Sequence, residues 1–295
     1  MTLVIDAHQH VWDPARARYD WLGPEPSAID RAFDLEDAFP SMRRAGIDAT
    51  VLVQAADNAE DTANLLSEAD RHPEVVGLVA WIPLDDPDAA AASLAALRRD
   101  PRVVGVRNLI HDRPDPDWIL RPEVDAGLGV LEAADVPFDY VTSGPAALAH
   151  LTAISARHPK LRIVIDHLGK PPIGGDPGAR TYWRGLMTEA ARNPLISAKV
   201  SGLYTVVGPM DGWTTELLRP FLDDALALFG PDRLMFGSDW PVSVLAGGYD
   251  RVWNGLAPIL DDLDAAERAA LLGGTAASFY RLDPELLARV GKESA

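Results

Sequence analysis

The chain has 295 residues, of which 47% are hydrophobic and 24% are charged, the composition of a globular protein rather than a disordered or collagen-like one. Its formal net charge of −17 argues against a nucleic-acid-binding or membrane-surface protein, because so acidic a surface repels phosphate groups. The absence of cysteine excludes disulfide bonds and cysteine-ligated zinc sites.

The first residues show neither the basic region nor the apolar stretch of a signal peptide. No apolar run approaches the roughly 20 residues that are needed to cross a bilayer. We therefore expect a cytoplasmic protein with no membrane and no nucleic acid among its partners. The sequence leaves the oligomeric state open and is compatible with a homo-oligomer.

The predicted strands are short and nearly all apolar, as expected of parallel strands that are buried on both faces. In chain order they are Leu3–Ala7, Ala49–Gln54, Val75–Ile82, Val103–Arg107, Val136–Thr142, Leu161–Asp166, Ile196–Ser201 and Arg233–Gly237. Helical patterns lie between and after them, at Glu60–His72, Asp88–Arg99, Pro145–His158, Arg180–Arg192, Thr214–Phe229 and Asp264–Phe279.

Eight strands that alternate with helices predict an α/β fold, a single (β/α)8 TIM barrel. Such a barrel takes about 250 residues, so we expect one domain over residues 1–295. A doubly wound open sheet is the alternative, but it usually has fewer strands, and no Gly-x-Gly-x-x-Gly turn follows the first strand. Active sites of TIM barrels lie at the C-terminal ends of the strands, so polar residues there are the functional candidates.

The motif His8-Gln9-His10 follows the first predicted strand. Residues i and i+2 of a strand face the same way, so both imidazoles are predicted to converge on one point at the barrel mouth. Imidazole is the commonest neutral metal ligand and a proton carrier near neutral pH. Two structural histidines are the alternative, but the position at the end of the first barrel strand favours function.

Asp239 closes the eighth predicted strand. Because a barrel closes on itself, this carboxylate is predicted to lie beside the first strand, where it can bind a metal or take a proton from water. A helix N-cap or turn aspartate is the alternative, but Trp240-Pro241 follows directly and makes a helix start less natural there.

His167 ends the sixth strand, where it can hydrogen-bond a carbonyl oxygen, orient water or bind a metal. Lys199 lies inside the apolar seventh strand, and lysine is rarely buried without a partner. Lys199 either forms a salt bridge inside the barrel or polarises a substrate oxygen, and the sequence leaves both open. Asp239, His167 and Lys199 are the catalytic candidates.

Five further residues are candidates for substrate binding. Arg107 ends the fourth strand and can clamp a carboxylate or a lactone oxygen. Lys170 lies on the loop after the sixth strand, where it can bind an anionic or polyhydroxy substrate or remain solvated. The rings of Trp21 and Trp240 can stack on a sugar face or only pack, and Tyr140 is a weaker candidate.

These motifs together resemble the amidohydrolase-2 branch of the amidohydrolase superfamily. More narrowly, they are similar to its sugar lactonases, the group of L-fuconolactonase and L-rhamnonolactonase-like proteins. The segments that carry the resemblance span almost the whole chain, at Ile5–Asp13, Tyr19–Trp21, Val164–Pro171, Lys199–Leu203, Leu234–Val242 and Gly273–Ala277. Their order makes the resemblance specific for the group, but not for one substrate.

The resemblance implies a hydrolase that opens a lactone ring, with a sugar-derived aldonolactone or a muconolactone-like compound as the small-molecule substrate. In that scheme Asp239 is the general base that takes a proton from the attacking water. The strand-end histidines, Lys199 or Arg107 would polarise the carbonyl and stabilise the oxyanion.

The resemblance also implies one divalent metal ion such as Zn²⁺, with His8, His10 and Asp239 as ligands and His167 as a further candidate. Binuclear members of the superfamily place a carboxylated lysine or a glutamate on the fourth strand and usually a histidine on the fifth. This chain has Val106–Asn108 and Phe138–Val141 there, so a two-metal site is not expected. Whether catalysis requires the metal stays open, because a lactone carbonyl is activated enough for general-base hydrolysis.

The main alternative is a metal-dependent, non-oxidative decarboxylase of an unsaturated or aromatic acid on the same scaffold. A barrel retained only as a binding protein is a third hypothesis. The joint presence of His8, His10, His167 and Asp239 argues against it.

Overall fold

The computed structural model describes residues 3–23, 27–142, 144–207 and 212–293. Eight parallel strands pair in chain order and form one sheet. Its strands are β1 (Ile5–Gln9), β2 (Ala49–Val53), β3 (Val75–Ala80), β4 (Val103–Arg107), β5 (Phe138–Tyr140), β6 (Ile163–Ile165), β7 (Ile196–Val200) and β8 (Leu234–Phe236).

The sheet closes into a barrel because β1 pairs with the segment that follows β8. Asp239 donates its backbone N–H to His8 O at 2.8 Å, and His10 donates to Trp240 O at 2.7 Å. These bonds place the residues that follow β8 beside His8 and His10. The predicted (β/α)8 TIM barrel is confirmed, with strands near all eight expected positions.

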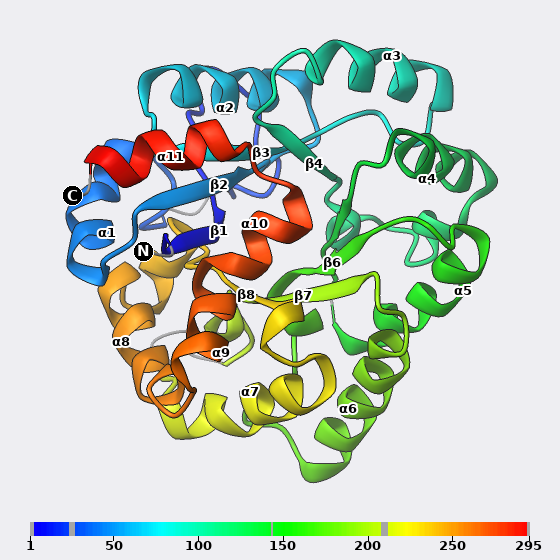
Figure 1. Ribbon diagram of the computed structural model, residues 1–295. Coiled ribbons are helices and arrows are strands. Elements are labelled where there is room, and N and C mark those ends of the chain that lie inside the picture. The colour runs from blue at the N-terminus through cyan, green and yellow to red at the C-terminus, as the bar shows by residue number, and fades with distance from the viewer. Residues whose placement is uncertain (1–2, 24–26, 143, 208–211, 294–295) are drawn as a thin grey trace.

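Helices surround the ring of strands, as Figure 1 shows. They are α1 (Phe39–Ala45), α2 (Ala59–Arg71), α3 (Pro87–Leu97), α4 (Pro122–Ala134), α5 (His150–Arg157), α6 (Pro177–Ala191), α7 (Thr215–Phe229), α8 (Tyr249–Leu260), α9 (Ala265–Ala269), α10 (Thr275–Tyr280) and α11 (Pro284–Glu293). None of the described helices is long and apolar enough to cross a membrane.

Two of the predicted boundaries are wrong in ways that matter for the site. β1 continues to Gln9, so His8 is a strand residue, and only His10 lies beyond the strand. The predicted helix Asp264–Phe279 is divided into α9 and α10 by a wider helical turn at Ala270–Gly274. This division lets α10 turn across the barrel, where it lies in front of the strands in Figure 1.

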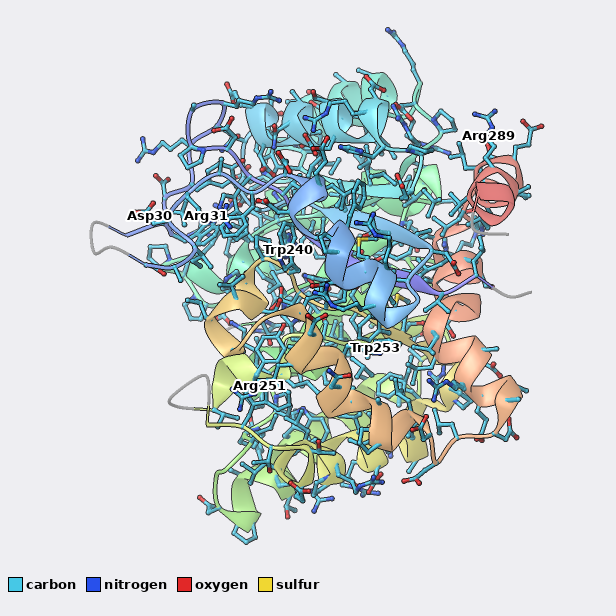
Figure 2. The ribbon with its side chains drawn as sticks, turned by 90° about the vertical axis from the view of Figure 1, so that its left-hand side faces the viewer. Asp30, Arg31, Trp240, Arg251, Trp253 and Arg289 are labelled. Atoms are coloured by element: carbon cyan, nitrogen blue, oxygen red, sulfur yellow. The ribbon has the colours of Figure 1, made fainter. Side chains whose placement is uncertain are left out.

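The two ends of the barrel are built differently. Figure 2 shows Asp30 and Arg31, from the long connection between β1 and α1, at the end opposite to Arg289 of α11. The connections after the strands form the first end, and α10 and α11 cover the other. The end with the post-strand loops is therefore the one at which a TIM barrel holds its active site.

Candidate active site

Four side chains converge at the C-terminal end of the barrel, and we call them the mouth cluster: His8, His10, His167 and Asp239. His8 Nε2 lies 3.1 Å from His10 Nε2, as expected for side chains two residues apart along one extended segment. Asp239 Oδ1 lies 3.4 Å from His10 Nε2 and 3.7 Å from His8 Nε2. The His167 ring meets the His8 ring at 4.6 Å between centroids.

Left-handed backbone turns aim two members of the cluster. His167 has φ 55° and Asp239 has φ 54°, conformations that cost side-chain-bearing residues on the order of 1–3 kcal/mol. Gly202, just after β7, lies against both: a Cβ there would come within 2.4 Å of His167 Nδ1 and 2.8 Å of Asp239 Oδ2. Only glycine leaves room for these two side chains to approach each other.

Asp6 braces the cluster from inside β1. Its Oδ1 accepts hydrogen bonds from the backbone N–H of His8 at 3.1 Å and of Ser238 at 2.9 Å, and its Oδ2 accepts one from Tyr249 at 2.8 Å. One carboxylate thus fixes the backbone beside both His8 and Asp239. We did not predict Asp6 or Gly202 as site residues, although an aspartate inside an apolar strand was a readable signal.

The electrostatics leave the cluster with neutral imidazoles around an ionised carboxylate. Burial lowers the pKa of His8, His10 and His167 below the ordinary histidine value. Burial alone would raise the pKa of Asp239, but the neighbouring His167 and His10 and the positive charge of Arg107 outweigh it and lower that pKa. A carboxylate that stays charged beside neutral histidines can accept a proton or bind a cation.

The donor atoms of the cluster fit a metal ion. His8, His167 and Asp239 each offer a ligand atom within 4.8 Å of the others. His10 adds a fourth, because its Nδ1 lies 2.7 Å from Val53 O and donates to that carbonyl, which leaves the Nε2 lone pair facing the cluster. Three imidazoles and one carboxylate are the ligand types that zinc prefers. The structure thus brings His167, the further candidate, together with the three ligands expected from the sequence.

Beneath the cluster lies a second set of polar side chains, which we call the inner charge layer: Arg107, Asp139, Asp166 and Lys199. Lys199 Nζ lies 2.5 Å from Asp139 Oδ2 and 3.2 Å from Asp166 Oδ1, and Arg107 Nη1 donates to Asp166 Oδ2 at 3.0 Å. Their side chains are at most 4% exposed. Two cations and two carboxylates compensate one another.

The layer changes how two of the predicted residues are understood. Lys199 is fully enclosed, so the structure favours the salt bridge inside the barrel over direct contact with a substrate oxygen. Arg107 donates to Asp166 and to the backbone carbonyl of Gln54, and its Nη1 also lies 3.4 Å from His8 Nε2 in the mouth cluster.

Lys170 and the two predicted tryptophans lie near the mouth. Lys170 lies close to His111: burial, and then the positive charge of Lys170, lower the pKa of His111 to about 3. Trp240 follows Asp239 and packs edge-on against Phe33 at 5.5 Å between ring centroids. Trp21 donates its indole N–H to Ala55 O at 2.7 Å.

Tyr140 is the predicted substrate-binding residue that the structure does not bring to the mouth. Side chains alternate along β5, so Asp139 points into the barrel and Tyr140 points toward the helices. The Tyr140 hydroxyl donates to Ala147 O at 2.8 Å and lies 3.2 Å from His150 Nδ1. The backbone and helix α5 occupy the contacts that we expected a substrate to make.

A broad cavity of about 1180 Å³ opens beside the mouth cluster, over the loops after β1 to β4. None of the four side chains of the cluster lines it. Aromatic rings, five carboxylates and three arginines share the lining, among them Trp21, Trp81, Asp57, Asp85 and Arg113. The reactive groups therefore belong to the mouth cluster, and the cavity is a separate open space beside it.

Comparison with known proteins identifies the family of the chain. The family model described as amidohydrolase matches residues 5–282. The L-fucono-1,5-lactonase of Burkholderia ambifaria is 39% identical and covers 96% of this chain and 97% of its own length. The L-fucono-1,5-lactonase of Burkholderia multivorans is 35% identical over 98% of this chain and 99% of its own.

A solved amidohydrolase from Burkholderia multivorans with bound zinc superposes with a TM-score of 0.88 at 34% identity, over 95% of this chain and 100% of its own. The gamma-resorcylate decarboxylase of a Rhizobium species is more distant, at 24% identity over 83% of this chain and 80% of its own. The chain therefore belongs to the amidohydrolase family.

Proposed function

We propose that the protein is a sugar lactonase that hydrolyses the ring ester of an aldonolactone, with L-fucono-1,5-lactone as the first substrate to test. The observation that carries the proposal is the mouth cluster, in which neutral His8, His10 and His167 surround the ionised Asp239. The similarity to two L-fucono-1,5-lactonases over nearly the full length supports the choice of substrate.

In the proposed reaction Asp239 removes a proton from a water molecule as the water oxygen forms a bond to the lactone carbonyl carbon. The carbonyl becomes an oxyanion, to which His167 can donate a hydrogen bond from Nε2 when its Nδ1 accepts one from Ser201 Oγ. The oxyanion then collapses, the bond between the carbonyl carbon and the ring oxygen breaks, and the ring oxygen takes the proton from Asp239. The hydroxy acid that forms ionises and releases one proton.

A zinc ion held by His8, His10, His167 and Asp239 would supply a Lewis acid that polarises the carbonyl oxygen. The chain's own residues then hold the substrate and move the proton. His10 is oriented by Val53 O, and His167 by Ser201 Oγ at 2.9 Å from its Nδ1. These hydrogen bonds to the Nδ1 atoms fix the orientation of the two imidazole rings at the site.

The charges near the mouth support a neutral, hydroxylated lactone over an anionic one. Arg107 is paired with Asp166, and Arg113 Nη2 lies 2.8 Å from Asp57 Oδ2. Five carboxylates and three arginines line the adjoining cavity, so its lining carries a net negative charge. Aromatic faces beside carboxylates suit sugar hydroxyl groups, whereas a muconolactone carries a carboxylate of its own. We accordingly place muconolactones second.

The test is a panel assay in weakly buffered solution with a pH indicator. L-fucono-1,5-lactone, other aldonolactones and a muconolactone are each compared with their spontaneous hydrolysis. We expect proton release well above the background for aldonolactones and little for the muconolactone. Turnover of the muconolactone alone would refute the sugar-lactone assignment.

The decarboxylase alternative is tested on the same preparation with 2,6-dihydroxybenzoate. That chemistry depends on a firmly bound metal and releases carbon dioxide, so it predicts complete inhibition by a chelator. Our proposal predicts no carbon dioxide from this acid.

We also propose that the enzyme lies in the cytoplasm. Cell fractionation should then recover the activity in the cytoplasmic fraction.

A further inference from the structure

The inner charge layer continues toward the far end of the barrel through one hydroxyl group. Tyr280, the last residue of α10, donates its hydroxyl to Asp139 Oδ2 at 2.8 Å. Its ring lies inside the barrel, 5.6 Å from Lys199 Nζ. Gly105 of β4 leaves the space for it, because a Cβ there would come within 3.2 Å of Tyr280 Cε1 and 3.5 Å of Asp139 Oδ1.

Lys199 connects this end of the barrel to the mouth cluster. Its Nζ lies 2.5 Å from Asp139 Oδ2 and 3.0 Å from His8 Nδ1. Asp166 Oδ1 lies 3.3 Å from the same ring nitrogen. A continuous series of contacts therefore runs from Tyr280 through Asp139 and Lys199 to His8.

His8 Nδ1 thus faces one group that can only donate and one that can only accept. If Nδ1 carries the ring proton and donates it to Asp166, the lone pair of Nε2 faces the mouth cluster. If Lys199 instead donates to Nδ1, the ring proton moves to Nε2, and that nitrogen can no longer bind a metal. The 3.4 Å contact of Nε2 with Arg107 Nη1, a pure donor, fits the first tautomer, and a metal ion bound by both His8 Nε2 and His10 Nε2, which lie 3.1 Å apart, would require it.

We propose that Tyr280 is a positioning residue for the active site: its hydroxyl holds Asp139, Asp139 holds the Lys199 ammonium, and His8 is thereby kept with its Nε2 lone pair toward the mouth. The inference deepens the proposed function, but its first readouts, metal affinity and tautomer, need no substrate. A failed lactone assay would leave it standing.

The geometry shows why one hydroxyl group matters here. Within the described part of the chain, Asp139 Oδ1 has no hydrogen-bond partner, so Tyr280 and Lys199 together hold the carboxylate through Oδ2. Without the hydroxyl, Asp139 can rotate, and Lys199, which already lies 3.0 Å from His8 Nδ1, can turn one of its protons toward that nitrogen. Such outer contacts of metal ligands change metal affinity by about 10–100-fold when they are removed.

The experiment compares Tyr280→Phe with Tyr140→Phe, each of which removes one buried tyrosine hydroxyl. Tyr140 is the matched control, because its hydroxyl donates to Ala147 O outside the barrel wall. Zinc affinity is measured by competition with a chromogenic chelator, and stability by the urea midpoint. We expect both variants to lose similar stability, but only Tyr280→Phe to bind zinc about 10-fold more weakly.

With an active substrate, Tyr280→Phe should also lower kcat while KM stays near the wild-type value. Equal zinc affinity and equal kcat in the two variants would overturn the proposal. If Tyr280→Phe does not fold, nitrogen-15 NMR of the histidine rings in the wild-type protein decides the question. The proposal requires a protonated Nδ1 on His8 with zinc bound, and a proton on Nε2 would overturn it.

Discussion

The mouth cluster and the inner charge layer are adjacent sets of polar side chains inside one barrel, yet their charges are satisfied in different ways. The cluster sets three neutral imidazoles around one carboxylate, so its lone pairs and its charge remain available to a ligand. The layer pairs two cations with two carboxylates and is closed to solvent. The position of a charged residue at the end of a barrel strand therefore does not make it catalytic. What matters is whether an opposite charge already pairs with it or leaves it available to a ligand.

Asp239→Asn should have the largest effect, because it removes the proposed proton acceptor while keeping the shape of the side chain. We expect kcat/KM for an aldonolactone to fall by about 10³-fold or more. The urea midpoint, measured alongside, should stay close to the wild-type value. A variant that keeps more than one tenth of the activity would contradict the assignment of the reactive carboxylate to the mouth cluster rather than to the inner charge layer.

Lys199→Met should act mainly on stability, because it leaves the carboxylates of Asp139 and Asp166 short of one positive charge. Breaking a buried pair costs about 3–5 kcal/mol in the free energy of unfolding. The double variant Asp139→Asn/Lys199→Met removes one charge of each sign and should recover much of the loss. Urea unfolding of both proteins measures this, and a single variant as stable as the wild type would contradict the paired layer.

The pH profile should show the smallest change. The lowered pKa of Asp239 keeps the general base ionised, and the lowered pKa values of His8, His10 and His167 keep the imidazoles neutral below their ordinary range. We expect kcat/KM to vary less than about twofold between roughly pH 7.5 and pH 5.5. An acid limb with an apparent pKa at or above about 6.5 would show instead that a histidine protonates there.

Local patterns were enough to predict the barrel and the approach of His8 to His10. Period-two alternation placed both rings on one side of the chain, and barrel closure placed Asp239 beside them. The end of β1 was misplaced because pairing sustains it: Gln9 is in register with Leu52 of β2 and forms a bridge with Trp240. Pairing with residues far away in the sequence therefore extends β1 beyond the residue at which the local composition predicts its end.

Other features depended on tertiary contacts that no local pattern reports. Helix α4 was not predicted, and glycines at 127 and 129 weaken its helical signal. A Cβ on Gly127 would lie 2.0 Å from Leu84 O, so packing requires the glycine. The bond between Arg107 and Asp166 joins residues 59 positions apart, and Tyr280 reaches Asp139 from 141 positions away.

Hydrolysis of L-fucono-1,5-lactone in water enriched in oxygen-18 tests the central claim most directly. If water attacks the carbonyl carbon, mass spectrometry of the product after one turnover will find one labelled oxygen, in the carboxylate. The hydroxyl group formed from the ring oxygen will be unlabelled. Label in that hydroxyl group, or no enzyme-dependent ring opening, would contradict the account.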